Sequence, residues 1–251
     1  MKNIHLIVLF LILVSNVVSA QSVFDQGNDH YREGNFEAAI QSYESIIKDG
    51  KHSCDLYYNL ANSYYKLEKT GPAIYYYEKA LLISPNDKDI QNNLKFAKAK
   101  TIDEIKEVPK VGFEKLVQNL TGLFHFNTWS IFAIGFSVLF LLLFLGYYFS
   151  GNSTSKRIFF VGMFIVPVFM LISIFAAWFE HHLFEQEQPA IVFAETIEVK
   201  NEPRENATEA FTIHEGTKVF IVETLDNWHK IQLADESEGW IMAEAIKPLK
   251  P

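Results

Sequence analysis

The sequence predicts a multidomain membrane protein in which an all-α region, two transmembrane helices and a small all-β region follow one another along the chain. Two long apolar runs near the middle predict the membrane helices. Helical periodicity before these runs predicts the α region, and alternation of apolar and polar residues after them predicts the β region. With 251 residues, the chain is long enough for two small domains beside the membrane segments, but not for one large catalytic core.

Two apolar runs, Trp129–Phe149 and Ile158–Phe179, have the length of membrane spans. A helix of about 20 residues crosses the roughly 30 Å of hydrocarbon in a bilayer, and it satisfies its own backbone hydrogen bonds there. The intervening loop, residues 150–157, carries one lysine, one arginine and no acid, which predicts that it lies in the cytoplasm. We therefore expect a two-pass hairpin whose flanking regions both lie outside the cytoplasm. Pro167 predicts a kink in the second helix.

Residues 1–20 have the pattern of a secretory signal peptide. Lys2 supplies the positive start, Leu6–Val14 the apolar core, and Val18–Ala20 the small residues of a cleavage site. An uncleaved membrane anchor is the alternative. The apolar core of about nine residues is short for a membrane span, so we expect cleavage directly after this segment. Export of the residues that follow agrees with the orientation predicted from the loop charges.

Composition and motifs argue against several classes of function. The formal net charge of −8 disfavours a nucleic-acid partner, which calls for clustered lysine and arginine. The single cysteine, Cys54, excludes an internal disulfide and a multi-cysteine metal site. The sequence contains neither a phosphate-binding loop nor a serine-hydrolase elbow. His181 and Glu185 have a spacing that could hold a metal, but they coincide with the end of an apolar run, where polar residues resume. We therefore expect no catalytic residue, metal or cofactor.

The chain between residues 21 and 108 contains an internal repeat. Three residues recur 34 positions later, where Ala39, Ile40 and Tyr43 return as Ala73, Ile74 and Tyr77. This separation is the period of the tetratricopeptide repeat, in which two packed helices form one unit. Asp55–Asp87 resembles such a repeat. The residues at its signature positions are Tyr57, Leu60, Ala61, Tyr64, Ala73, Tyr77, Ala80 and Pro85.

The resemblance implies an all-α solenoid of two tetratricopeptide repeats over residues 21–108, the first one weaker than the second. After Pro85, the residues Ile90, Leu94 and Ala97 fall on one face of a helix whose other positions are polar. Such a helix caps the apolar end of a short solenoid. We expect it to run to about Ile105.

The resemblance also implies a concave face that binds a peptide or protein. The positions on that face are Asn28, Arg32, Asn59, Asn62, Tyr65 and Lys66. Some repeats of this family grip a C-terminal carboxylate with two asparagines and several basic residues. Here Phe24, Asp89 and Asn93 stand at the basic positions, which argues against that mode. The alternative to any groove function is that these side chains are solvated polar residues on helix surfaces.

Residues 109–128 connect the repeats to the first apolar run. Apolar residues recur there at helical spacing, and they are Phe113, Leu116, Val117, Leu120, Leu123 and Phe124. Polar residues occupy the opposite side, so we predict a short amphipathic helix. It lies at the membrane surface or packs against the repeats, and the sequence favours neither placement.

Residues 186–251 change to a period of two, which is typical of strands. Strands are predicted at 190–200, 218–224, 228–233 and 239–242, with five or six in total. A sheet of this size is stable as a small closed barrel, because closure removes exposed edges.

Four segments of this region resemble bacterial SH3 domains, namely Glu215–Phe220, Asn227–Ile231, Glu238–Ile241 and Ile246–Leu249. The resemblance implies that Trp228 and Trp240 are core and rim residues, with ligand binding as the alternative role. The loop Glu198–Asn206 departs from the sequence that this family usually has there.

The order of signal peptide, tetratricopeptide repeats, membrane hairpin and SH3-like domain resembles the BatE-type proteins of the bacterial aerotolerance (Bat) operon. This resemblance implies an inner-membrane protein with both soluble domains in the periplasm and a short cytoplasmic loop. It also implies protein partners, namely von Willebrand A-domain membrane proteins of the same operon and a MoxR-type ATPase. We expect a non-enzymatic scaffold. The alternative is an envelope sensor or peptidoglycan-binding module that acts through the SH3-like domain.

Overall fold

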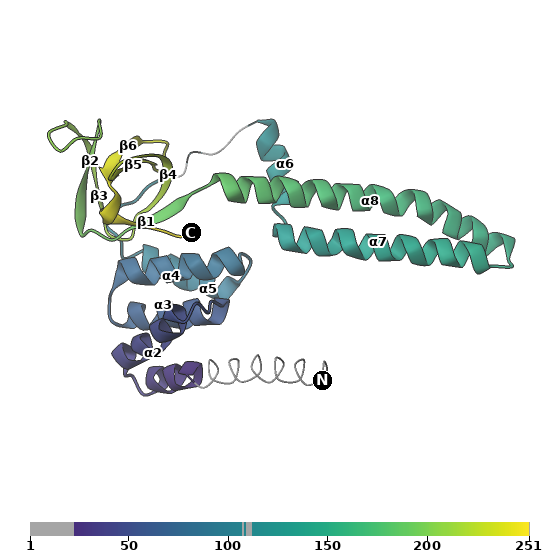
Figure 1. Cartoon of the computed structure of the whole chain (residues 1–251), viewed down its shortest axis with the longest axis horizontal. Coiled ribbons are helices and arrows are strands. Elements are labelled where there is room, and N and C mark those ends of the chain that lie inside the picture. The colour runs from purple at the N-terminus through teal and green to yellow at the C-terminus, as the bar shows by residue number, and fades with distance from the viewer. Residues whose placement is uncertain (1–22, 107, 109–111, 251) are drawn as a thin grey trace, which may run out of the picture. The chain divides into compact units, whose positions relative to one another are not determined.

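The computed structural model describes residues 23–106, 108 and 112–250 (Figure 1). The predicted signal peptide lies outside the described residues. The chain divides into two compact units. One unit joins the residues up to Val108 with those from Gln188 onward, and the other comprises Pro109–Glu187.

The N-terminal part of the first unit is helical, as predicted. A helix at residues 23–32 is followed by α2 (Phe36–Lys48), α3 (Cys54–Lys66), α4 (Thr70–Ile83) and α5 (Lys88–Lys98). Ser53 and Asp87 cap α3 and α5 because their side chains accept hydrogen bonds from backbone N–H groups of the first turn. Ala39 and Ala73 are fully buried, and these small side chains let neighbouring helices approach closely.

The capping helix is shorter than predicted. It ends at Lys98 rather than near Ile105. The residues that follow leave the helix because Asp103 bonds to the β region, and Ile105 packs into the core of that region. Tertiary contacts therefore override the local helical pattern at this point.

The second unit contains α6 (Phe113–Thr121), α7 (Phe126–Phe149) and α8 (Ser153–Gln186). The helices α7 and α8 lie side by side as a hairpin (Figure 1). Their contacts are antiparallel, since Phe136 stacks on Phe169 and the glycine Gly146 faces Phe159. Because Gly146 has no side chain, the helices can approach closely here. A Cβ at this position would lie 2.9 Å from the Phe159 ring.

The two long helices differ from their predicted bounds. α8 begins at Ser153, so part of the predicted loop is helical, because the Asn152 side chain caps its first turn. It continues through Pro167 as one helix and runs to Gln186, beyond the apolar segment that ends at Phe179. Nothing in the polar residues after that segment breaks a helix until Pro189.

Both helices are long and apolar enough to cross a membrane. In the most apolar window of α7, 0% of the residues are buried within the chain, and in that of α8 11% are buried. A core helix of a soluble protein would be buried against its neighbours, and these two are not. This exposure is consistent with a two-pass membrane protein.

The connector helix α6 packs against α8 within its own unit. The Thr121 hydroxyl donates to Glu180 Oε1 at 2.5 Å, and Trp129 Nε1 donates to the Thr121 carbonyl at 2.6 Å. Leu116 and Leu120 stay 63% and 70% exposed, so these two side chains have little cover within the described chain.

The C-terminal region is one antiparallel sheet of seven strands in the order β3-β2-β6-β5-β4-β1-β7. The strands are β1 (Pro189–Val192), β2 (Thr196–Lys200), β3 (Glu209–His214), β4 (Lys218–Leu225), β5 (Trp228–Gln232), β6 (Glu238–Met242) and β7 (Ile246–Pro248), with a short 3₁₀ turn, η1 (Ala243–Ala245), before the last.

Two features of the sheet correct the prediction. The single strand predicted at 190–200 is two strands, because the backbone turns after Val192 and β2 pairs with different neighbours from β1. The strand β3 was not predicted, because Ile213 is its only buried residue and its periodic signal is weak. The strand β7 lies within Ile246–Leu249, a segment expected only from the resemblance to SH3 domains. The total of seven strands exceeds the expected five or six.

The sheet curls around one apolar core (Figure 1). Val199 and Ile213 come from one end of the strand order, and Val192 and Ile246 come from the other. All four are buried in the same cluster, so the two ends of the sheet approach each other across it. A small β region at the C-terminus is therefore confirmed.

The repeats and the sheet also share a core. Ile191 and Leu249 of the β region are buried in one cluster with residues of α3, α4 and α5. Tyr75 on α4 packs edge-on against Phe193 with ring centroids 5.5 Å apart. Its hydroxyl donates to the Pro248 carbonyl at 3.2 Å. The regions on either side of the apolar hairpin are thus parts of one folded body.

Candidate functional site

A pair of hydrogen bonds orients the first predicted asparagine. Asn28 Oδ1 accepts from the Tyr43 hydroxyl at 2.8 Å and from Asn59 Nδ2 at 2.9 Å. Asn28 lies on the helix at residues 23–32, Tyr43 on α2 and Asn59 on α3. The three consecutive helices are therefore connected through one side-chain oxygen.

The same arrangement recurs one repeat later. Asn62 Oδ1 accepts from the Tyr77 hydroxyl at 2.5 Å and from Asn93 Nδ2 at 3.0 Å. All three positions are shifted by the repeat period, since 62 − 28, 77 − 43 and 93 − 59 each equal 34. We call the six residues Asn28, Tyr43, Asn59, Asn62, Tyr77 and Asn93 the asparagine–tyrosine ladder.

The ladder fixes which amide groups are available to a ligand. In both repeats the shared oxygen is engaged twice, which leaves the Nδ2 groups of Asn28 and Asn62 as donors. Within the described residues, no hydrogen bond from either Nδ2 group is found. Burial raises the pKa of Tyr43 to about 12, and it also raises the pKa of Tyr77. Both hydroxyls therefore keep the protons that they donate at neutral pH.

The six predicted groove residues line two hollows. The first has a volume of about 490 Å³ and is lined by Asp25, Asn28, Tyr31, Arg32, Tyr43 and Asn59. The second has a volume of about 180 Å³ and is lined by Tyr31, Asn62, Tyr65, Lys66, Tyr77, Asn93 and Phe96. Tyr31 belongs to both, so the hollows are neighbours. We refer to them as the first and second hollow.

Charged groups lie near both hollows. Arg32 pairs with Asp29 on its own helix and donates to the Asn28 carbonyl at 3.3 Å, while its side chain stays 72% exposed. Tyr65 lines the second hollow, and Lys100 Nζ lies 4.3 Å from the centre of its ring. Lys66 is exposed beside this ring. Both hollows therefore offer cations close to amide donors.

Four residues of the second hollow were not among the predicted groove residues, namely Tyr31, Tyr77, Asn93 and Phe96. Asn93 was treated as a departure from the carboxylate-gripping pattern, although it stands 34 positions after Asn59 and that spacing could have identified it. Phe96 lies on the capping helix and is 63% exposed. An exposed aromatic ring at this position can be covered by an apolar side chain of a partner.

The two predicted tryptophans lie on the outer face of the sheet. Trp228 and Lys230 alternate with the fully buried Ile231, and Trp240 pairs with Lys230 in the strand register. Both rings are half-buried, and neither lines the hollows of the repeats. Trp240 also pairs with Lys200 of β2, so a lysine flanks it on each side.

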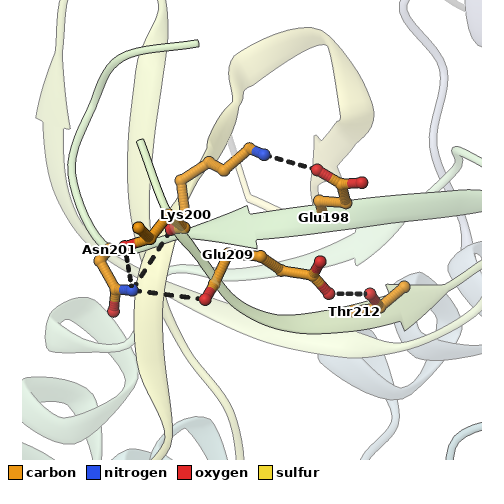
Figure 2. A network of polar contacts seen from close by, with 6 residues as sticks. Glu198, Lys200, Asn201, Glu209 and Thr212 are labelled. Atoms are coloured by element: carbon orange, nitrogen blue, oxygen red, sulfur yellow. Dashed lines mark hydrogen bonds and ion pairs between the residues drawn. The ribbon is translucent and has the colours of Figure 1, made fainter. Parts of the chain in front are cut away.

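Ion pairs and hydrogen bonds occupy the polar groups around Trp240. Lys200 pairs with Glu198 at 2.5 Å, as Figure 2 shows, and Lys230 pairs with Glu238 at 2.6 Å. Asn201 closes the adjacent loop, because its Nδ2 donates to the Thr208 hydroxyl at 3.0 Å. The loop that departs from the SH3 pattern is thus held by its own side chains.

One histidine near the end of α8 pairs with a carboxylate of the same helix. His181 Nδ1 lies 3.6 Å from Glu185 Oε2, one helical turn away. Across the part of the chain that the structure describes, no three histidine, cysteine or carboxylate side chains gather as they would around a metal ion.

Comparison with known protein families matches residues 54–87 to the tetratricopeptide repeat. These residues include α3 and α4, and the match agrees closely with the repeat predicted at Asp55–Asp87. A search of curated proteins gave no match. The chain therefore contains a tetratricopeptide repeat, a unit that generally mediates contacts between proteins.

Proposed function

We propose that the protein is a non-enzymatic membrane scaffold whose two hollows bind an extended segment of a protein partner. The observation that carries the proposal is the asparagine–tyrosine ladder, which repeats one hydrogen-bonding geometry at a period of 34 residues. An extended peptide presents main-chain carbonyls at regular intervals, and the free Nδ2 groups of Asn28 and Asn62 are donors that match them.

The contacts available in the hollows suit a partner that binds with modest affinity but with specificity. Each hydrogen bond between partner and amide contributes about 0.5–1.5 kcal/mol after water is displaced. Phe96 adds an exposed ring that an apolar partner side chain can cover. The ladder is held by internal hydrogen bonds before any partner arrives, so little ordering is required on binding.

The shared core supports a two-pass arrangement in the membrane. Residues on both sides of the apolar hairpin are buried in one cluster, so they must lie in the same compartment. A segment that leaves and returns to the same compartment crosses the membrane an even number of times, and α7 and α8 supply two crossings. The positive charges of Lys156 and Arg157 support a cytoplasmic loop, and with it a folded body on the periplasmic side.

The domain order supports a more specific setting. Its resemblance to BatE-type proteins favours a Bat/MoxR-type assembly or stress-tolerance system in the bacterial inner membrane. In that setting, the partners in the groove are membrane proteins with von Willebrand A domains. The curled sheet and its sequence motifs favour an SH3-like barrel.

A second candidate function rests on the outer face of the sheet. Trp228 and Trp240 are half-exposed there, beside Lys200 and Lys230. Aromatic rings of this kind can stack on the sugars of peptidoglycan, as the envelope-sensor alternative requires. The ion pairs that already engage both lysines make this the weaker candidate.

Photocrosslinking in cells tests the proposal. The crosslinker p-benzoylphenylalanine is placed at Asp25 in the first hollow, at Phe96 in the second, and at Ile83 as a control. Ile83 is 48% exposed and lies at the end of α4, outside both hollows. We expect the first two positions to crosslink the same protein and the control to crosslink none. Crosslinking from Ile83 alone, or different proteins from the two hollows, would overturn the proposal.

A further inference from the structure

A buried carboxylate joins the repeats to the β region. Glu78 on α4 is 6% exposed. Its two oxygens accept from Lys98 on α5 and from Lys218 on β4, each at 2.7 Å. Burial alone raises the pKa of Glu78, but the charges of Lys218 and Lys98 outweigh it and lower the pKa overall. The anion is therefore held between three elements, one of which belongs to the sheet.

The two repeats differ at this carboxylate, because within the described residues only the second repeat pairs it with lysines. The position equivalent to Glu78 is Glu44, and the position equivalent to Lys98 is Tyr64, each 34 residues earlier. The Tyr64 hydroxyl donates to Glu44 Oε1 at 2.6 Å. The same pair of positions is thus a neutral donor with a carboxylate in the first repeat and an ion pair in the second. In the second repeat, the β region adds Lys218 as a further cation.

The carboxylate lies next to the ladder. Glu78 follows Tyr77 directly on α4, and Lys98 is on α5, the helix that carries Asn93. The ladder of the second hollow requires both helices, because Tyr77 and Asn93 donate to the same oxygen of Asn62. Any shift of α4 against α5 would separate these two donors.

Other contacts hold the β region at this position. Lys218 pairs with Ile191 in the strand register, and Ile191 is buried in the shared core. Asp103 accepts from the His214 backbone N–H at 2.7 Å and from the Thr217 hydroxyl at 2.6 Å. Gly216 packs so closely that a Cβ there would lie 2.9 Å from Ile74.

We infer that the β region positions the second hollow, and that Lys218 is the positioning residue that acts on it through Glu78. The sheet then serves as part of the binding body, in addition to any ligand of its own. This inference rests on the proposed function, since it assigns a role to the same hollow. It predicts that a change in the sheet, away from the hollow, weakens binding in the hollow.

Three variants of the full chain test the inference, solubilised in detergent for hydrogen exchange and expressed in cells for crosslinking. Lys218→Met removes the charge, and Lys218→Arg keeps it. Lys230→Met is the matched control, because Lys230 lies on the same sheet, pairs with Glu238 at 2.6 Å, and has a side chain 31% exposed against 32% for Lys218. The first readout is the rate of hydrogen exchange in α4 and α5. The second is the yield of partner crosslinked by p-benzoylphenylalanine placed at Phe96 or at Asp25.

We expect Lys218→Met to speed exchange in α4 and α5 and to lower crosslinking at Phe96 by about fivefold or more, with a smaller loss at Asp25. Lys218→Arg should restore crosslinking, and Lys230→Met should change neither readout. Unchanged crosslinking at Phe96 in Lys218→Met would overturn the inference. If the wild-type chain crosslinks nothing, the proposed function fails. Exchange then decides alone, and equal rates in Lys218→Met and wild type would reject the positioning role.

Discussion

Asn28 and Asn62 each accept two hydrogen bonds through one side-chain oxygen, and this sharing determines the chemistry of the groove. An amide whose oxygen is doubly engaged presents only N–H donors to a ligand. A solvated asparagine on a helix surface would rotate freely and offer both groups. The fixed orientation therefore favours a binding role over the alternative that these are only solvated polar residues.

Removal of one ladder hydroxyl should weaken the fold measurably. Tyr77 is 1% exposed, and Tyr77→Phe deletes its hydrogen bond to Asn62 without creating a cavity. We expect the free energy of unfolding to fall by about 1 kcal/mol, measured by urea denaturation. Tyr65→Phe serves as the control, because the Tyr65 hydroxyl has no hydrogen-bond partner among the described residues. Equal losses in both variants would contradict the ladder.

Gly216 tests the contact between the repeats and the sheet. Its φ of +88° is strained for any residue with a side chain, and a Cβ would also lie 2.9 Å from Ile74 and Thr101. Gly50 has a φ of +73° but nothing within 4 Å of its Cβ position. Gly50→Ala should therefore cost about 1 kcal/mol from backbone strain alone. Gly216→Ala should cost roughly 1–3 kcal/mol more, because it also overpacks the interface. Thermal unfolding of both variants measures the difference.

At the scale of elements, the sequence predicts what has a regular period. The repeat of 34 residues and the apolar runs could be identified in the sequence, because these helices repeat one pattern of apolar residues along their length. Asn93 was left out of the predicted groove residues because it was compared with the family pattern and not with Asn59, 34 positions earlier. The end of α5 was missed because a contact distant in sequence, that of Asp103 with His214, determines it.

Acidic pH should loosen the contact between the repeats and the sheet. Burial raises the pKa of Asp103, but hydrogen bonds from Thr217 and His214 lower it by more, so the net shift of the pKa is downward. The pKa of Glu78 is also lowered, despite its burial, by Lys218 and Lys98. A carboxylate with a lowered pKa in the folded state stabilises the fold above its unfolded pKa, which is about 4 for these groups. That stability is lost as the pH falls through the folded pKa.

Denaturation midpoints between pH 7 and pH 3 measure this loss. The denaturant concentration at the wild-type midpoint should decrease once the pH is below about 4. Asp103→Asn should be less stable at pH 7 and should lose less on acidification, because one of the two titrating groups is gone. Parallel curves for the two proteins would show that Asp103 does not carry the effect.

For the whole molecule, the core that the repeats share with the sheet constrains the membrane topology. Chains that are buried together cannot lie on opposite sides of a membrane. It also affects the choice of experiments, since deletion of either soluble region would expose the apolar surface that the other covers. Point substitutions that leave the core intact are therefore the appropriate tests.

Cysteine labelling tests the topology. In a Cys54→Ala background, we place single cysteines by Asp49→Cys, Asp226→Cys and Asn152→Cys, and we treat sealed right-side-out membrane vesicles with an impermeant maleimide. The first two sites should react before permeabilisation, and the third only afterwards. Labelling of the Asp49 and Asp226 sites from opposite sides would contradict the shared core and the two-pass arrangement together.

In the proposed function, the groove of the repeats binds the partner, and the outer face of the sheet does not. The most direct measurement compares crosslinking from p-benzoylphenylalanine at Phe96 in two double variants. Asn59→Ala with Lys66→Ala alters both hollows, and Trp228→Ala with Trp240→Ala alters the outer face. We predict that the first variant lowers the yield of crosslinked partner about tenfold and that the second leaves it unchanged. An unchanged yield in the first variant, with a loss in the second, would contradict the claim.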